Sequence, residues 1–272
     1  MIALVRELYN FRELVAALAW RNITVRYKQA YLGIAWAIIR PLSLMLIFTL
    51  VKSIVGIDSG SIPYPILTFA ALMPWIFFQD SASEGTGSVV TNASLVRKIY
   101  FPREVFPLTT MASKLIELAI NFGILGLLMA WYGMMPTIHA LWVPVILLYT
   151  VLVALGVALV GAAINVYYRD IGAALPVALS MLMYASPVIY PLQLVRDKLL
   201  VEQAAGEWSR LLYVIYTINP LAGIIDGFQN ALLRGLPPDL MSMLPGMIAT
   251  LLLLPLSYRF FKRAEAYFAD VI

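Results

Sequence analysis

Two carboxylates one helical turn apart are the residues of this sequence whose spacing suggests chemistry. Asp80 and Glu84 lie at positions i and i+4, so a helix places both side chains on one face. Such a pair inside a membrane segment can relay protons, which would indicate a secondary transporter. Alternatively, the carboxylates pair with bases such as Arg97 or Lys98, and we favour this structural interpretation. The small residues 85–88 that follow permit close approach of a second helix.

A basic residue inside an apolar stretch is the second candidate. Arg40 lies about two turns into residues 33–55, where a charge is costly unless it snorkels to the lipid headgroups or meets an anion. Snorkelling would make Arg40 a structural residue, whereas a bound anion would make it a functional one. In residues 106–131, Lys114 and Glu117 are spaced to form an internal ion pair.

Residues 92–107 form an island of charge between two long apolar segments, so we expect them outside the membrane. Asn92 and its neighbours offer N-cap oxygens and Pro102 cannot continue a helix, which predicts about two helical turns over residues 93–100. An apolar strip on this helix could dock into a partner; a solvated loop that only sets topology is the alternative. The expected strip consists of Leu95, Val96 and Ile99, and the charged residues are Arg97, Lys98, Arg103 and Glu104.

Other catalytic patterns are missing from the sequence. It has no phosphate-binding loop, no H-E-x-x-H and no G-x-S-x-G. It contains no cysteine and only one histidine, His139, which excludes disulfides and a histidine-rich metal site. We therefore expect no catalytic residue, metal or cofactor in this chain. A polytopic membrane transferase would need an acid/base cluster or a nucleophile that these scattered carboxylates do not supply.

The composition is that of an integral membrane protein. Of the 272 residues, 62% are hydrophobic and 12% are charged, and the mean hydropathy is +0.86. The net charge of +4 could suggest nucleic acid, but the basic residues fall between apolar runs, where they set orientation and meet anionic lipid. The N-terminus interleaves charged and apolar residues without a cleavage site, so we expect no removable signal peptide.

The apolar runs predict a single all-α transmembrane domain over residues 1–272 with six transmembrane helices and both termini in the cytoplasm. Residues 1–32 would form a cytoplasmic amphipathic region, with spans one to five in 33–190. An outer segment at 191–243, span six at 244–258 and a cytoplasmic tail at 259–272 would follow. The six spans are expected at residues 33–55, 66–90, 106–131, 141–166, 171–189 and 244–258.

The outer segment decides the topology. Residues 211–218 and 221–233 are apolar, but each is too short to cross a membrane and Asn219-Pro220 separates them. If this stretch crossed, Arg259 and its basic neighbours would lie outside, against the positive-inside rule. We therefore predict two re-entrant half-helices, which are tolerated only beside protein or a polar cavity.

Short motifs are spread over most of the chain. They are Arg26-Tyr27-Lys28 with Leu32-Gly33 and Trp36 ahead of Pro41, Asn92-x-x-Leu95-Val96-x-Lys98-x-x-Phe101-Pro102-x-Glu104 with Pro107, Tyr168-Arg169-Asp170-Ile171, Ser186-Pro187-Val188-Ile189-Tyr190, and Asn219-Pro220. In this order they resemble the membrane subunit of bacterial ABC exporters for lipid-linked polysaccharides, the O-antigen and teichoic-acid permease family. Each motif is weak alone, and together they indicate the family without naming the glycan.

The resemblance implies a homodimer in the bacterial inner membrane, bound to two copies of a separate ATPase that holds ATP and Mg. The substrate would be a lipid-linked glycan of lipopolysaccharide or teichoic-acid biosynthesis. The amphipathic N-terminal region resembles the family's gate helix, and residues 92–102 resemble its coupling helix. The coupling residues would be Asn92, Leu95, Val96, Arg97, Lys98, Ile99, Phe101, Pro102 and Glu104.

Two further sites are our own inference from the residues and are not carried over from the resemblance. A cytoplasmic gate would receive the lipid pyrophosphate at Arg26, Lys28 and Arg40. An outer gate would lie at the half-helices, where tyrosine offers flat faces and hydroxyls to sugars. Its residues would be Tyr184, Tyr190, Ile215, Tyr216, Ile218, Asn219 and Pro220. The alternatives are an ABC permease for another amphiphile, such as a drug or lipid, and a proton-coupled transporter that uses Asp80 and Glu84.

Overall fold

The structure, a computed structural model, is built of helices, and no strand occurs in the residues that it describes. The described ranges are 11–28, 31–56, 62–98, 101–201 and 207–271. Residues 1–10 of the expected amphipathic region and Ile99 of the expected docking strip lie outside them. The first described helix is α2 (Arg12–Tyr27), which packs on α6 (Val105–Trp131).

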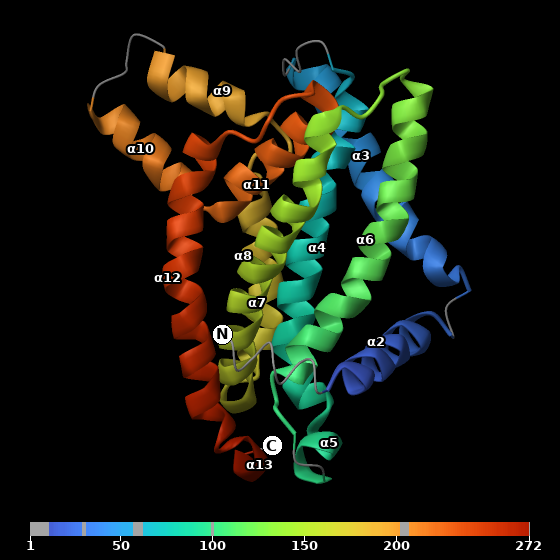
Figure 1. The fold of residues 1–272 in the computed structure, drawn as a ribbon, viewed down its shortest axis with the longest axis vertical. Helices are drawn as coiled ribbons and strands as arrows, with labels where there is room; N and C mark the ends of the chain where they lie inside the picture. The colour runs from blue at the N-terminus through green and yellow to red at the C-terminus, as the bar shows by residue number, and fades with distance from the viewer. Residues whose placement is uncertain (1–10, 29–30, 57–61, 99–100, 202–206, 272) are drawn as a thin grey trace.

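The long helices run along the long axis of the molecule, with successive ones in opposite directions (Figure 1). Within the described ranges, four helical segments are long and apolar enough to cross a membrane, at residues 33–55, 105–131, 138–167 and 240–265, and a fifth is possible if a bent pair counts as one span. Two further helices correspond to expected spans but are not among these four segments. Helix α4 (Tyr64–Thr91) has 28 residues with a polar second half, and helix α8 (Asp170–Tyr184) has 15 residues. Besides α6, these helices are α3 (Trp36–Val55), α4 (Tyr64–Thr91), α7 (Val143–Tyr167), α8 (Asp170–Tyr184) and α12 (Leu240–Glu265), with η1 (Gly33–Ala35) before α3 and η2 (Ile138–Trp142) before α7.

Helix α4 forms the core, because α3, α6, α7, α8 and α11 (Pro220–Gln229) all pack against it. Its contact with α7 is close: a Cβ built at Gly85 would lie 2.7 Å from Ala158 Cβ, and one at Gly161 would lie 2.0 Å from Thr86 Oγ1. The small residues after Glu84 thus allow the close helix approach that the sequence predicted.

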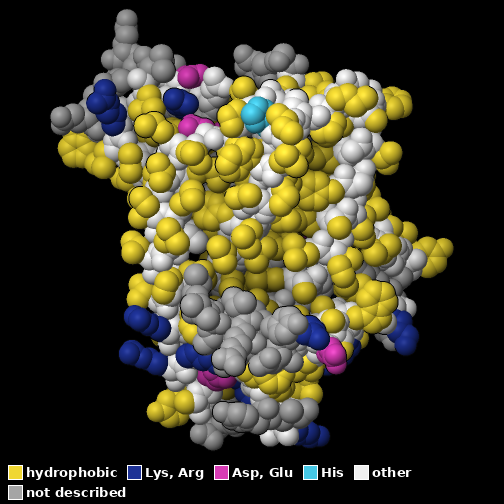
Figure 2. Space-filling model, in the orientation of Figure 1, with side chains coloured by type: hydrophobic (Ala, Val, Ile, Leu, Met, Phe, Trp, Pro, Cys, Tyr) yellow, Lys and Arg dark blue, Asp and Glu magenta, His cyan; other side chains and the backbone are white. Residues whose placement is uncertain are grey.

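Charged side chains gather at the two ends of the face shown in Figure 2, and hydrophobic side chains cover the middle. Helices α2, α5 (Ala93–Lys98) and α13 (Phe268–Val271) lie toward one end, and the segment between α8 and α12 lies at the other (Figure 1). This distribution is typical of a protein whose middle is covered by lipid.

The segment between α8 and α12 returns to the end from which it started (Figure 1). The pair formed by α10 (Glu207–Ile218) and α11 is bent by 81° at Asn219 and Pro220. The Asn219 side chain accepts a hydrogen bond from the Leu221 amide at 3.1 Å. The break at Asn219-Pro220 is confirmed, whereas re-entry of the pair, as opposed to one broken span, stays a prediction. The elements of the segment are α9 (Leu192–Arg196), η3 (Asp197–Val201), α10, α11 and η4 (Asn230–Arg234).

Some expected boundaries were wrong. Helix α3 begins at Trp36 and continues through Pro41. Helix α8 ends at Tyr184 rather than Ile189, and the residues from there to Pro191, which include Pro187, form turns and bends. Helix α12 extends beyond both expected ends and reaches Glu265 as one element.

Candidate functional site

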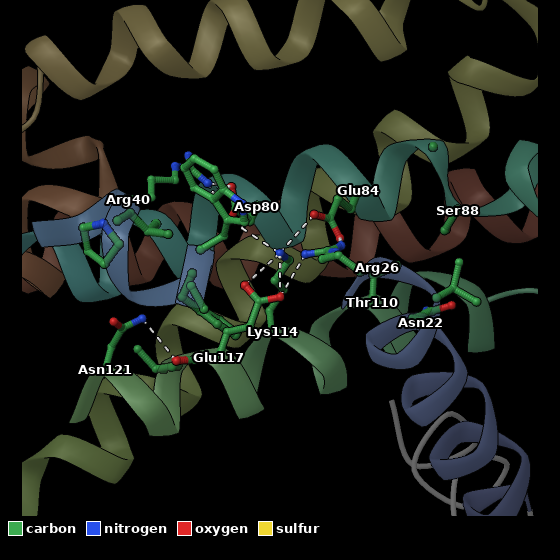
Figure 3. A pocket seen from close by; sticks show the side chains of 18 of the residues that line it. Asn22, Arg26, Arg40, Asp80, Glu84, Ser88, Thr110, Lys114, Glu117 and Asn121 are labelled. Carbon is green, nitrogen blue, oxygen red and sulfur yellow. Dashed lines mark hydrogen bonds and ion pairs between the residues drawn. The ribbon is translucent and has the colours of Figure 1, made fainter. Parts of the chain in front are cut away.

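A cavity of about 1070 Å³ lies between α2, α3, α4 and α6 (Figure 3). Charged side chains from all four helices line it. The bases are Arg21 and Arg26 of α2, Arg40 of α3 and Lys114 of α6, and the carboxylates are Asp80 and Glu84 of α4 and Glu117 of α6.

Lys114 lies at the centre of this charged group. Its Nζ is 3.0 Å from Glu84 Oε1, 3.0 Å from Glu117 Oε2 and 3.5 Å from Asp80 Oδ2. Only 3% of the side chain is exposed. Three carboxylates at such short range would repel each other without a shared cation, so Lys114 holds α4 and α6 together at this level. The pair with Glu117 confirms the sequence prediction.

Two arginines approach the same carboxylates from the more exposed side. Arg26 of α2 pairs with Glu84 and, at 2.9 Å, with Glu117. Arg40 donates from Nη1 to both oxygens of Asp80 at 2.8 Å. The side chains of Arg26 and Arg40 are 33% and 44% exposed, so solvent screens their pairs more than it screens those of Lys114.

Lys114, Arg26 and Arg40 match the three carboxylates, and Arg21 adds a fourth cation to the cavity lining. The group can exchange partners when an anion enters, because Arg26 and Arg40 can each leave a carboxylate for a phosphate oxygen. Asn121 also lines the cavity, and its buried Oδ1 has no hydrogen-bond partner among the described residues. The arrangement can therefore receive a ligand with negative charge and hydrogen-bond donors.

The expected ion pairs of Asp80 and Glu84 are present, but their partners were predicted wrongly. We expected Arg97 or Lys98, which follow α4 in the sequence; the partners are Lys114, Arg26 and Arg40, from three other helices. Arg40 does not snorkel to the headgroups, because it points to Asp80 (Figure 3).

The third gate residue, Lys28, is exposed beyond the end of α2. It does not line the cavity that holds Arg26 and Arg40. Spacing alone gave no signal for Arg26, whose carboxylate partners lie 58 and 91 residues away.

The expected coupling segment forms a short helix, α5, as the sequence predicted. Leu95 is half-buried and Arg97 and Lys98 are exposed, whereas Val96 is buried within the chain and cannot belong to an exposed docking strip. Asn92 was expected to cap α5; instead its side chain donates to the Ser88 carbonyl at 2.8 Å and accepts from Arg21 of α2.

The residues after α5 also differ from the expectation. Arg103 and Glu104 were expected in water, but they are 8% and 1% exposed. Phe101 is buried and Pro102 is half-buried. The segment after α5 therefore packs into the protein, and within the described part of residues 92–107 the exposed charged side chains are those of Arg97 and Lys98 in α5.

The residues of the expected outer gate lie together. The Tyr190 hydroxyl donates to the Tyr184 carbonyl at 3.2 Å, and the Tyr216 hydroxyl donates to the Tyr190 hydroxyl at 3.3 Å. Asn219 donates to Ser186 Oγ at 2.8 Å, which joins the half-helices to the broken end of α8. Ile215 and Ile218 are exposed on α10, and Pro220 is half-buried.

Comparison with known proteins gives the family. The family model described as ABC-2 type transporter matches residues 13–233. The chain is 29% identical over 273 residues to the O-antigen export system permease protein RfbA of Myxococcus xanthus, with 100% of both chains covered. It is 25% identical over 265 residues to the protein of that name from Klebsiella pneumoniae (96% of this chain, 95% of the relative), and 24% identical over 227 residues to the polysialic acid transport protein KpsM of Escherichia coli (81% of each). Because the matched region covers most of the sequence, the chain belongs to the ABC-2 type transporter family.

Proposed function

We propose that the chain is the membrane subunit of an ATP-driven exporter that moves a lipid-linked polysaccharide across the bacterial inner membrane. The observation that carries the proposal is similarity over the whole length to a permease named for O-antigen export. ATP and Mg would be bound by a separate ATPase subunit, since the sequence has no phosphate-binding loop.

Reconstitution tests this function. The chain would be purified with its ATPase and placed in vesicles whose outer leaflet carries the lipid-linked glycan, with the ATPase on that side. ATP should make the glycan inaccessible to an external lectin, whereas an ATPase with its catalytic base removed should not. Transport that ignores ATP and follows a pH gradient would support the proton-coupled alternative, and ATP-driven movement of a lipid without a glycan would support a permease for another amphiphile.

The functional unit would be a homodimer with two ATPases. A row of polar groups on the outside of the bundle supports this: Gln79 of α4 accepts from Arg40 Nη2 at 3.5 Å and donates to Ser180 Oγ of α8 at 3.3 Å. Arg40 and Ser180 are exposed in the chain by itself. Lipid tails cannot satisfy such groups, so a second copy or an aqueous path between two copies would cover this face.

We propose six spans, with α3, α4, α6, α7, α8 and α12 crossing the membrane and both termini in the cytoplasm. The alternation of these helices supports this, as do the exposed Arg259 and Arg263 at the end of α12. Because the native chain has no cysteine, a single introduced cysteine reports its own side of the membrane. Arg263→Cys should react only with reagent on the cytoplasmic side and Thr137→Cys only with reagent outside; the reverse result would overturn the topology.

The cavity is the proposed entry site for the lipid head, with Arg26 and Arg40 as the receiving cations. A diphosphate would replace Asp80 and the glutamates as the partner of the arginines, while Lys114 keeps the carboxylates balanced. Arg26 would leave α4 and α6 in this exchange, which would free α2 to move as a gate. Lys28 would stay outside the cavity and meet anionic lipid at the membrane surface.

Helix α5 is the proposed docking site for the ATPase. Leu95 supplies apolar surface beside the exposed Arg97 and Lys98. Leu95→Asp would place an unpaired charge in that contact, so we expect ATP hydrolysis without export or loss of the ATPase on purification. If Leu95→Asp leaves both export and assembly unchanged, α5 is not the docking helix.

A further inference from the structure

The connection from α5 to α6 is tied to the cytoplasmic end of α12. Lys262 Nζ lies 2.8 Å from Glu104 Oε2 and 2.9 Å from Glu265 Oε2. The Tyr258 hydroxyl donates to Glu104 Oε1 at 3.5 Å, and the Arg103 amide donates to Glu265 Oε1 at 3.1 Å. We call these five residues, Arg103, Glu104, Tyr258, Lys262 and Glu265, the clasp.

The clasp reaches α5 itself. The guanidinium of Arg103 donates to the Val96 carbonyl, in the last turn of α5, at 2.7 Å and lies 5.4 Å from the centre of the Phe101 ring. Helix α13 contacts α5 directly, and Phe268 of α13 packs edge-on against Phe261 of α12. Helix α5 thus contacts α13 directly and is linked to α12 through Arg103 and Glu265.

The opposite end of α12 is joined just as closely to the re-entrant pair. A Cβ built at Gly246 of α12 would lie 2.7 Å from Pro220 Cα, and one at Gly223 of α11 would lie 2.8 Å from Met243 Cα. Backbones this close cannot slide past each other without overlap, so α11 must follow a displacement of the outer end of α12. At 26 residues, α12 is about 39 Å long.

We propose that α12 carries the movement of the docking helix to the outer half-helices, and that Glu104 and Lys262 are the positioning residues that attach α5 to it. This inference rests on the proposed docking of an ATPase at α5. A displacement of α5 is transmitted to α12 through the ion pair of Glu104 and Lys262 and through the hydrogen bond between Arg103 and Glu265. Helix α12 then displaces α11 at Pro220. Without the pair, an ATPase could dock and hydrolyse ATP while the outer gate stays still.

The test is an accessibility measurement in the assembled complex. Tyr216→Cys provides a reporter at the outer half-helices, and the rate of its reaction with a water-soluble maleimide is measured with and without ATP and Mg. In this background, Glu104→Gln removes the charge that attracts Lys262 while keeping the size of the side chain. It should reduce the ATP-dependent change in labelling rate by about twofold to thirtyfold, the range found for substitutions along coupled elements, with ATPase binding retained.

Two variants are compared with Glu104→Gln. Lys262→Arg keeps the cation and should keep the labelling response, and Arg259→Gln removes an exposed charge at the same end of α12 and should have no effect. An unchanged response in Glu104→Gln overturns the proposal. Loss of assembly in Glu104→Gln would also overturn it, since the clasp would then be needed for folding rather than for transmission.

The labelling needs no glycan, so it separates this inference from the function on which it rests. If the parent complex changes its labelling with ATP but transports no polysaccharide, the proposed substrate is wrong and the role of α12 can still hold. If the parent assembles and exports but Glu104→Gln behaves like it in both assays, the clasp plays no part in coupling.

Discussion

Helix α4 meets its neighbours in two different ways. Against α7 it places Gly85 and Thr86 at distances where not one extra methyl group fits. Against α2, α3 and α6 it places Asp80 and Glu84 opposite cations around a cavity. Close steric packing resists displacement because any shift produces overlap, whereas partly exposed ion pairs exchange partners easily. We expect α4 and α7 to stay together during transport while α2 and α3 move.

The largest effect should come from Lys114 of α6, the most buried of the cations that line the cavity. Lys114→Met leaves Asp80, Glu84 and Glu117 without their shared partner, which should cost about 3–5 kcal/mol of stability. Thermal unfolding of the purified protein in detergent measures this. Lys52→Met serves as the control, because Lys52 is half-buried over the Tyr64 ring at 5.7 Å. Equal stability of both variants would show that the arginines alone balance the carboxylates.

Gly161→Ala should break the contact between α4 and α7. Its methyl group would overlap Thr86 Oγ1 at 2.0 Å, so we expect a loss of about 1–3 kcal/mol and a low yield of folded protein. Thr86→Ala should restore part of the loss by removing that oxygen. Gly126→Ala is the matched control on α6, where a new Cβ would meet no atom within 4 Å. A stable Gly161→Ala variant would mean that α4 and α7 can separate.

Arg40→Ala tests the side of the cavity formed by α2 and α3, the helices that we expect to move. It should reduce export by about tenfold or more, the effect of one lost hydrogen bond to a charged group, with folding retained. The double variant Arg40→Ala with Asp80→Asn also removes the charge of the partner carboxylate, and it distinguishes two possible roles of Arg40. If Arg40 only balances Asp80, the second substitution restores export; if Arg40 receives the lipid head, export stays low. Basal ATPase activity without substrate should be unchanged in both variants.

The smallest effect should come from the outer gate. Tyr190→Ala removes an aromatic face and the hydrogen bonds of Tyr190 with Tyr184 and Tyr216. Export of long glycan chains should therefore slow by about twofold to tenfold. Tyr190→Phe keeps the ring and should lose less. The measurement is the length distribution of exported glycans. A uniform loss over all chain lengths would indicate a structural role instead.

The sequence alone predicted the class of protein, the four apolar segments that are long enough to cross a membrane and the short helix after α4. These follow from local properties: hydrophobic length, the charges between apolar runs, and the prolines that end helices. It also located Asn219-Pro220 as a break, because proline at this position removes a donor and fixes the backbone. The pair Lys114–Glu117 was predictable because both residues lie on one helix.

The tertiary structure decided which charges meet. Asp80 pairs with Arg40 and Glu84 with Arg26, residues 40 and 58 positions away in sequence. Arg103 and Glu104, which were expected at the surface, are in contact with residues of α12 in the structure. Helical periodicity gives the face of a helix on which a residue lies but not the neighbour that covers that face. The cavity and the clasp therefore appear only when α2, α3, α4, α6 and α12 are packed together.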